Sequence, residues 1–179
     1  MKSSGKEPPS RKFRTFSRCT ALENVVLPLW LVKIEDEAFA DCTNLKTIVI
    51  PKGIEFIGER VFANCGSLTT VGKAGSGANV EMPEGMRIIS NQLFADCTGL
   101  TSVIFPANIT YVGMYAFQNC ISLQDLILAE TIEQIDIGAF WGCTSLETII
   151  IPSSITAIGE NAFRGCVKLG GIKFNGTME

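Results

Sequence analysis

Seven cysteines are the residues of this sequence whose type and spacing could do chemistry, and the sequence contains no histidine. A thiolate can act as a nucleophile, a metal ligand or one half of a disulfide. Successive cysteines lie 23 residues apart, except for 32 between Cys65 and Cys97. One cysteine at the same phase of each repeat predicts a column of small side chains that point into a core. We therefore predict buried free thiols at Cys19, Cys42, Cys65, Cys97, Cys120, Cys143 and Cys166.

The same spacing disfavours the reactive alternatives. A zinc site needs four ligands around one point, which a linear column does not supply. Neighbouring cysteines about 5 Å apart could form a disulfide by distance alone, but an odd, evenly spaced column cannot pair completely. Without histidine, the commonest general base and every Ser-His or Cys-His pair are missing. The glycine-rich stretch 72–77 lacks the Lys-Ser/Thr ending of a phosphate-binding loop. We expect no enzymatic activity, no metal and no cofactor.

The cysteines belong to a larger repeat. Phe-x-x-Cys-x-x-Leu occurs seven times, and it begins at Phe16, Phe39, Phe62, Phe94, Phe117, Phe140 and Phe163. A fixed period of this length is typical of stacked repeat architectures, in which neighbouring units bury a continuous core. The sequence therefore predicts a solenoid of about seven coils that spans residues 13–179 as a single domain.

Each coil has a predictable course. Residues 146–151 alternate apolar β-branched side chains with others, which predicts a short strand. Pro152 ends that strand because proline has no N–H for a ladder, although Ala129 takes this place in the fifth coil. Ile155 and Ile158-Gly159 predict a second short extended piece. One helical or 3₁₀ turn is then expected before the next Ala-Phe pair. Equivalent strands should stack in parallel at about 4.8 Å.

Two segments depart from the repeat. Residues 1–12 show no apolar periodicity and read as a disordered basic tail, which could touch nucleic acid or anionic lipid or simply be solvated. The residues after Arg18 include 9 basic and 17 acidic residues, which gives a net charge of −8. This charge argues against a nucleic-acid-binding face. An insertion of nine residues at 72–80 lengthens the third coil. Such insertions often form a binding loop, but a tolerated surface loop is the alternative.

The sequence leaves the compartment open. It contains no apolar run of about 18 residues that could span a bilayer, and its first residues lack the apolar core of a secretory signal. Neither end carries a polar capping element, so we expect a fragment of a longer array or a chain capped by partners.

The 23-residue unit resembles the BspA-like leucine-rich repeats. Their pattern is Leu-x-x-Ile-x-Ile-Pro-x-x-Val-x-x-Ile-Gly-x-x-Ala-Phe-x-x-Cys, and residues 146–166 match it at nearly every position. The resemblance covers residues 13–179 and implies a right-handed leucine-rich-repeat superhelix of mainly short parallel strands. It also implies a protein-binding role, because such repeats often lie in surface-exposed or secreted proteins associated with adhesion to host or matrix proteins. The motif positions are structural and imply no binding or catalytic residues.

Candidate partner-binding residues come from positions outside the motif. Outward-facing residues of the first strand row include Ile104, Ile127 and Ile150, where β-branched residues could reflect strand propensity or a partner-binding stripe. Five positions after the proline, a second row includes Phe56, Ile88 and Tyr111, which could form a hot spot or be buried by neighbours. Lys73, Ser76 and Asn79 represent the insert. Trp30 and Trp141 also lie outside the motif, where an exposed ring could anchor a partner.

We therefore predict a non-enzymatic protein-interaction module, and the resemblance implies that it is part of a cell-surface or secreted adhesin-like protein with a host or matrix protein as partner. An intracellular scaffold in a reducing, cytoplasmic compartment and an architectural spacer without a partner are the alternatives. Oligomeric state is open. For the cysteine column, we expect Cys120→Ser to cost about 1–3 kcal/mol because a buried hydroxyl would lack a partner.

Overall fold

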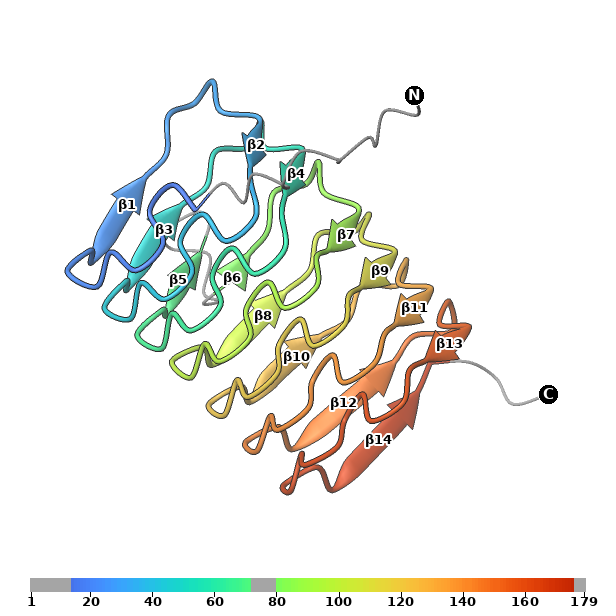
Figure 1. Ribbon diagram of the computed structural model, residues 1–179. Coiled ribbons are helices and arrows are strands. Elements are labelled where there is room, and N and C mark those ends of the chain that lie inside the picture. Colours follow the sequence, from blue (N-terminus) through green and yellow to red (C-terminus); the bar gives the residue numbers. More distant parts are fainter. Residues whose placement is uncertain (1–13, 72–79, 176–179) are drawn as a thin grey trace, which may run out of the picture.

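The computed structural model describes residues 14–71 and 80–175, without the side chains of Val80 and Glu81. The chain winds into a parallel β-solenoid whose coils stack from β1 at one end to β14 at the other (Figure 1). Within the described residues, six coils contribute strands to both faces of the stack, and a seventh ends in β14. The predicted fold class is confirmed.

The strands after the Cys-x-x-Leu segment form what we call the major face. Its strands are β1 (Asn24–Val26), β3 (Thr47–Val49), β5 (Thr70–Val71), β6 (Val80–Glu81), β8 (Ser102–Ile104), β10 (Asp125–Ile127), β12 (Thr148–Ile151) and β14 (Gly171–Phe174). The first six form one hydrogen-bonded parallel sheet, and β12 pairs with β14. No strand pairing joins β10 to β12, although the two strands remain neighbours. The ladder of the major face is therefore interrupted between these two coils.

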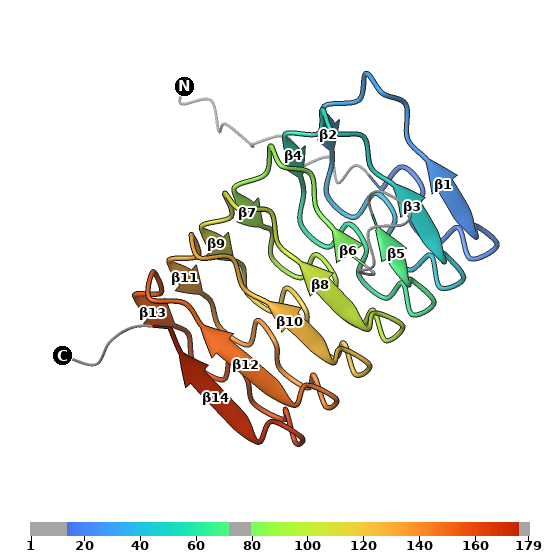
Figure 2. The ribbon, with the colours of Figure 1, turned by 180° about the vertical axis from the view of Figure 1, so that it is seen from behind.

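The second extended piece of each coil builds the minor face, on the other side of the stack (Figures 1 and 2). Its strands are β2 (Lys33–Ile34), β4 (Phe56–Ile57), β7 (Ile88–Ile89), β9 (Tyr111–Val112), β11 (Gln134–Ile135) and β13 (Ala157–Ile158). They form two parallel sheets, β2-β4 and β7-β9-β11-β13. Each of these strands has only two residues, since the chain must turn back toward the core at once.

The insertion splits the strand of its coil without breaking the major face. β5 pairs with β3, β6 pairs with β8, and Val71 and Val80 are partners across the split. Both roots of the insert therefore lie in the major face. On the minor face the same junction lacks a ladder between β4 and β7, where the Ser90 hydroxyl instead donates to the Ile57 oxygen at 2.5 Å.

The connection from the minor face to the phenylalanine consists of separate turns. Hydrogen bonds from residue i+3 to residue i close them, for example from the Ala40 N–H to the Glu37 oxygen at 3.1 Å and from the Cys42 N–H to the Phe39 oxygen at 3.2 Å. Glu37, which accepts the first bond, and Asp41, which lies within the second turn, have positive φ values of 55° and 61°. A left-handed residue cannot continue a right-handed helix, so the expected helical turn takes this form, and the intervening N–H groups bond to the next coil.

The core is a set of side-chain ladders between the two faces. The rings of Phe16, Phe39, Phe62, Phe94, Phe117, Phe140 and Phe163 stack in one column, with neighbouring centroids 5.2–6.0 Å apart. Leucine and isoleucine columns line the same interior, and Leu45, Ile48 and Leu68 are fully buried. Because each coil buries its motif residues against the coils beside it, the stack holds the surface side chains at regular intervals.

Candidate functional site

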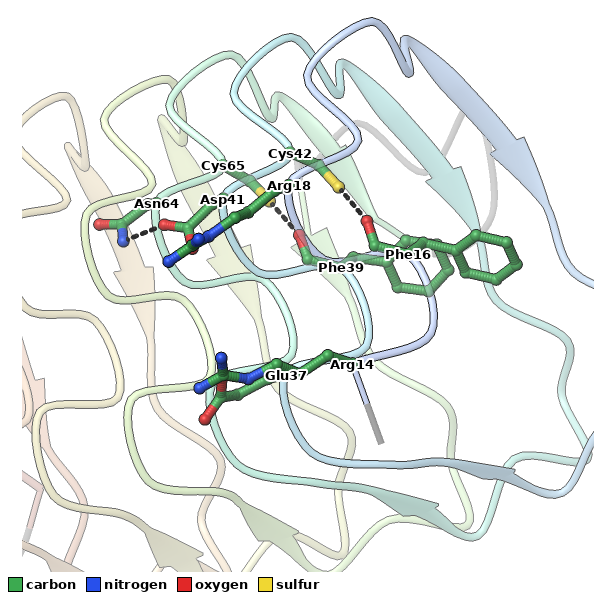
Figure 3. Close-up of polar contacts among 9 residues, drawn as sticks. All are labelled: Arg14, Phe16, Arg18, Glu37, Phe39, Asp41, Cys42, Asn64 and Cys65. Atoms are coloured by element: carbon green, nitrogen blue, oxygen red, sulfur yellow. Dashed lines mark hydrogen bonds and ion pairs between the residues drawn. The ribbon is translucent and has the colours of Figure 1, made fainter. Parts of the chain in front are cut away.

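The cysteine column lies in the core, where it is chemically quiet. Six of the seven thiols are buried, and each of the six donates a hydrogen bond of 3.0–3.2 Å to the main-chain oxygen of the phenylalanine in the preceding coil. Figure 3 shows two of these bonds, from Cys42 to Phe16 and from Cys65 to Phe39. Cys19 of the first coil is exposed, because no described coil precedes it. The prediction of buried free thiols is therefore confirmed for six positions and wrong for Cys19.

Burial also suppresses thiolate formation. It raises the pKa of Cys65 to about 12 and the pKa of Cys97, Cys120 and Cys143 well above the usual value of 9.0. Nucleophilic or metal-binding cysteines require the opposite shift. Within residues 14–71 and 80–175, no group of three or more Cys, Asp or Glu side chains could hold a metal ion. The column is a packing element.

The reason given for the Cys120→Ser expectation was wrong. The Cys120 Sγ lies 3.2 Å from the Phe94 oxygen, so a serine hydroxyl at this position would have an acceptor. The sequence alone did not reveal this carbonyl, because it belongs to the coil before.

The turns between the minor face and the cysteine column form what we call the turn ridge. Polar side chains of successive coils bond to one another along it (Figure 3). The Asn64 amide donates to Asp41 at 2.7 Å, and the Asn119 amide donates to Asp96 at 2.9 Å. The buried Glu37 carboxylate lies 2.5 Å from Nε of Arg14. These partly or fully buried polar side chains are therefore paired between coils, as is usual for polar groups removed from water. We assign this ridge a structural role.

The isoleucine row of the major face is exposed as predicted. Side chains of Ile104, Ile127 and Ile150 are 39%, 63% and 48% exposed on β8, β10 and β12. They line a hollow of about 360 Å³, together with the polar row Ser102, Asp125 and Thr148 beside them. The hollow spans the junction at which β10 and β12 lose their ladder. The structure thus gathers these three predicted residues into one surface.

The second predicted row lies on the minor face, apart from the isoleucine row. Phe56 and Ile88 are 38% and 41% exposed, so neighbouring copies do not bury them. The ammonium group of Lys33 lies 4.9 Å from the centroid of the Phe56 ring. Tyr111 is half-buried, and its hydroxyl donates to Asp136 in the next coil. The two rows occupy different faces and cannot form one flat site.

Of the remaining candidate residues, the structure describes only the two tryptophans. Lys73, Ser76 and Asn79 lie outside the described residues. Trp141 is half-buried between Tyr115 and Arg164, with ring centroids 6.2 Å apart and the guanidinium carbon 4.9 Å from the Trp141 ring. Trp30 is 78% exposed.

Sequence reasoning missed two features of the surface. The first is the polar row Ser102, Asp125 and Thr148, which the alternation of each strand places on the same face as the isoleucines. The second is Leu29, which is 87% exposed beside Trp30. A comparison of equivalent positions in the copies would have revealed Leu29 and Trp30, because large apolar side chains are not found at the equivalent turns of the other copies.

Comparisons with known proteins agree with the fold. The BspA type Leucine rich repeat region matches residues 11–76 and 73–179 in six copies. The T. pallidum leucine-rich repeat protein TpLRR is 27% identical, with a TM-score of 0.74, and the match covers 87% of this chain and 69% of that protein. Among curated proteins, no sequence matches significantly.

Two further crystal structures share the fold. A leucine-rich repeat protein from Eubacterium ventriosum is 23% identical, with a TM-score of 0.64, and the match covers 79% of this chain but only 42% of that protein. The pneumococcal vaccine antigen PcpA is 19% identical, with a TM-score of 0.56, over 88% of this chain and 52% of PcpA. The described part of this chain has no helix long and apolar enough to cross a membrane. With its repeat pattern matched almost end to end, the chain belongs to the BspA type leucine-rich repeat family.

Proposed function

We propose that this chain is a protein-interaction module that binds a partner on the major face, at the isoleucine row Ile104, Ile127 and Ile150. One observation carries the proposal: three large aliphatic side chains from successive coils are exposed over one hollow of about 360 Å³. Exposed apolar side chains over a hollow, rimmed by polar ones, are typical of protein-binding surfaces.

Charged side chains make the two ends of this surface different. Asp125 is exposed on β10, and Lys173 lies next to Ile150 in the ladder of β12 and β14. The hollow therefore has Asp125 in its lining, and Lys173 follows in the next coil beyond it. A partner segment with apolar side chains and a suitably placed opposite charge fits this arrangement.

The place of this module is a cell-surface or secreted adhesin-like protein, with a host or matrix protein as partner. The family resemblance supports this part of the proposal. The chemistry of the thiols does not decide the compartment, because buried, unpaired cysteines tolerate either redox environment. The described residues hold no catalytic constellation around the hollow, whose polar side chains are Ser102, Gln124, Asp125 and Thr148.

The test is affinity capture from extracellular-matrix and host-surface proteins. The intact chain is compared with three variants: Ile104, Ile127 and Ile150 changed to Asn, Phe56 and Ile88 changed to Asn, and deletion of residues 72–80. The deletion restores the 23-residue spacing and joins Val71 to Glu81 in the repeat pattern. We expect the first variant alone to lose the captured protein. Loss only in the second or third variant would move the site to the minor face or to the insert.

A matched control distinguishes loss of the surface from loss of solubility or fold. Ile121 is 45% exposed, but it lies in the turn after Cys120 and outside the hollow. Ile121→Asn should therefore keep the partner. Equal loss with Ile121→Asn and with the triple variant would contradict a site at the hollow.

A further inference from the structure

The turn that joins β1 to β2 presents two large apolar side chains to water. The Leu31 N–H closes this turn by donating to the Pro28 oxygen at 3.0 Å, which makes Leu29 and Trp30 its two central residues. Their side chains are 87% and 78% exposed. An aromatic and an aliphatic side chain this exposed have no role in packing the fold.

The equivalent turns of the other coils provide an internal comparison. Each follows the same position of the repeat and is closed by the same bond, for example from Ile54 to Pro51 and from Ile109 to Pro106. Their central pairs are Lys52-Gly53, Glu84-Gly85, Ala107-Asn108, Glu130-Thr131 and Ser153-Ser154. All of these residues are small or polar, and at least one of each pair is exposed. The turn geometry therefore does not require large apolar side chains such as Leu29 and Trp30.

The immediate surroundings of the turn are apolar and carry charges of both signs, since the exposed Glu55 donates its N–H to the Val32 oxygen at 2.9 Å. Val32 and Phe56, which follow on the minor face, are 56% and 38% exposed. An ideal Cβ on Gly53 would lie 3.8 Å from the Leu29 oxygen, so the tip of the next coil, with the exposed Lys52, lies directly alongside. The ammonium group of Lys33 lies 3.1 Å from the Glu35 carboxylate, which partly neutralises it. With Lys33 and Lys52 opposed by Glu35 and Glu55, the tip presents apolar side chains with little net local charge.

We propose that the Leu29-Trp30 turn inserts into the interfacial layer of a lipid bilayer. A tryptophan ring prefers the headgroup level, and leucine is among the side chains that enter the apolar layer most favourably. Lys52 can extend its ammonium group to lipid phosphates while its stem follows the apolar tip. The convex turn lacks the wide rim that excludes water around a hot spot between proteins. A single inserted turn gives weak, reversible attachment, which orients the stack at a surface.

Tryptophan fluorescence tests this directly. Trp30 and Trp141 are the two tryptophans of the sequence, so Trp141→Phe leaves Trp30 as the reporter. The full chain is mixed with vesicles of phosphatidylcholine alone and with vesicles that also contain phosphatidylserine. We expect Trp30 emission to shift to shorter wavelength on both, and brominated acyl chains to quench it. Changing Leu29 and Trp30 to Ser should lower vesicle co-sedimentation of the chain by about tenfold or more.

Val167→Ser is the matched control, because Val167 is 79% exposed in the turn after Cys166, outside both proposed surfaces, and should not affect vesicle binding. Circular dichroism verifies that each variant folds. If Trp141→Phe disturbs the contacts with Tyr115 and Arg164, co-sedimentation of the chain with both tryptophans decides instead. Absence of a shift and of co-sedimentation would overturn the proposal. Binding only to phosphatidylserine vesicles that survives the Leu29/Trp30 change would also overturn it. So would a shift of Trp30 emission that a soluble protein causes and vesicles do not.

Discussion

The ring of Tyr115 occupies the space that a side chain on residue 138 would need. An ideal Cβ on Gly138 would overlap Cε1 of Tyr115 and lie 2.5 Å from Cδ1. Gly138 has a φ of +59°, but so does Asn161 one coil later, and Tyr115 itself has a φ of 54° one coil earlier. The glycine is therefore required for space, since other residue types adopt this backbone conformation in the neighbouring coils. This contact places Tyr115 against Trp141 on the turn ridge.

Gly138→Ala should lower the free energy of unfolding by about 2–4 kcal/mol, since the new methyl group displaces a packed ring and alanine disfavours positive φ. Gly170→Ala is the control, because its Cβ would find no atom nearer than the Lys168 oxygen at 3.8 Å. Urea denaturation measures both changes. In a Tyr115→Ala background, Gly138→Ala should cost clearly less. An equal cost with and without the tyrosine ring would show that the ring is not the obstacle.

Cys120→Ser should cost about 1 kcal/mol, at the low end of the original expectation, because the serine hydroxyl keeps the Phe94 oxygen as acceptor. Cys120→Val removes the donor and adds volume to a filled column, so it should cost more, about 1–3 kcal/mol. Thermal melting compares the two variants with Cys19→Ser, which is exposed and should be nearly neutral. Serine costing more than valine would contradict the assigned hydrogen bond.

Alkaline pH should destabilise the fold through the thiols. In the unfolded chain a cysteine loses its proton near the usual pKa of 9.0, whereas burial holds the pKa of Cys65 at about 12 in the folded chain. The stabilisation is therefore complete below pH 9 and is lost as the pH rises from 9 toward 12, since only the unfolded state ionises there. Denaturation midpoints across this interval measure the loss. Cys65→Ser should show a smaller decline, and an identical decline would exclude this thiol as a cause.

Thiol labelling should distinguish one cysteine from the other six. Cys19 is exposed, whereas the remaining six are buried and hydrogen-bonded. Under native conditions at neutral pH, an alkylating reagent should therefore label Cys19 rapidly and the others only through unfolding. Mass spectrometry of peptides locates the label. Rapid labelling of Cys97 or Cys120 in the folded chain would contradict the packed column.

The repeat made most of the fold predictable. The positions of phenylalanine, cysteine and leucine determine which side chains are buried, and the proline after each strand marks the corner between the two faces. Local pattern could not reveal contacts between coils, such as the thiol of Cys120 on the Phe94 oxygen, because the partners are 26 residues apart. Nor could it show that the rows of Ile127 and Phe56 lie on different faces, since that depends on how sharply each corner turns. The ladder interruption between β10 and β12 has no sequence signal that we can identify.

The partner-binding row is the central claim, and one residue tests it most directly. Ile127 is the most exposed of the three isoleucines and lines the hollow at its middle strand. The measurement is the Kd of the captured partner for the native chain, for Ile127→Asp and for the control Ile121→Asp. A buried charge without a partner should weaken binding at least about tenfold for Ile127→Asp and leave Ile121→Asp unchanged. Equal affinities for all three chains would contradict a partner site on the major face.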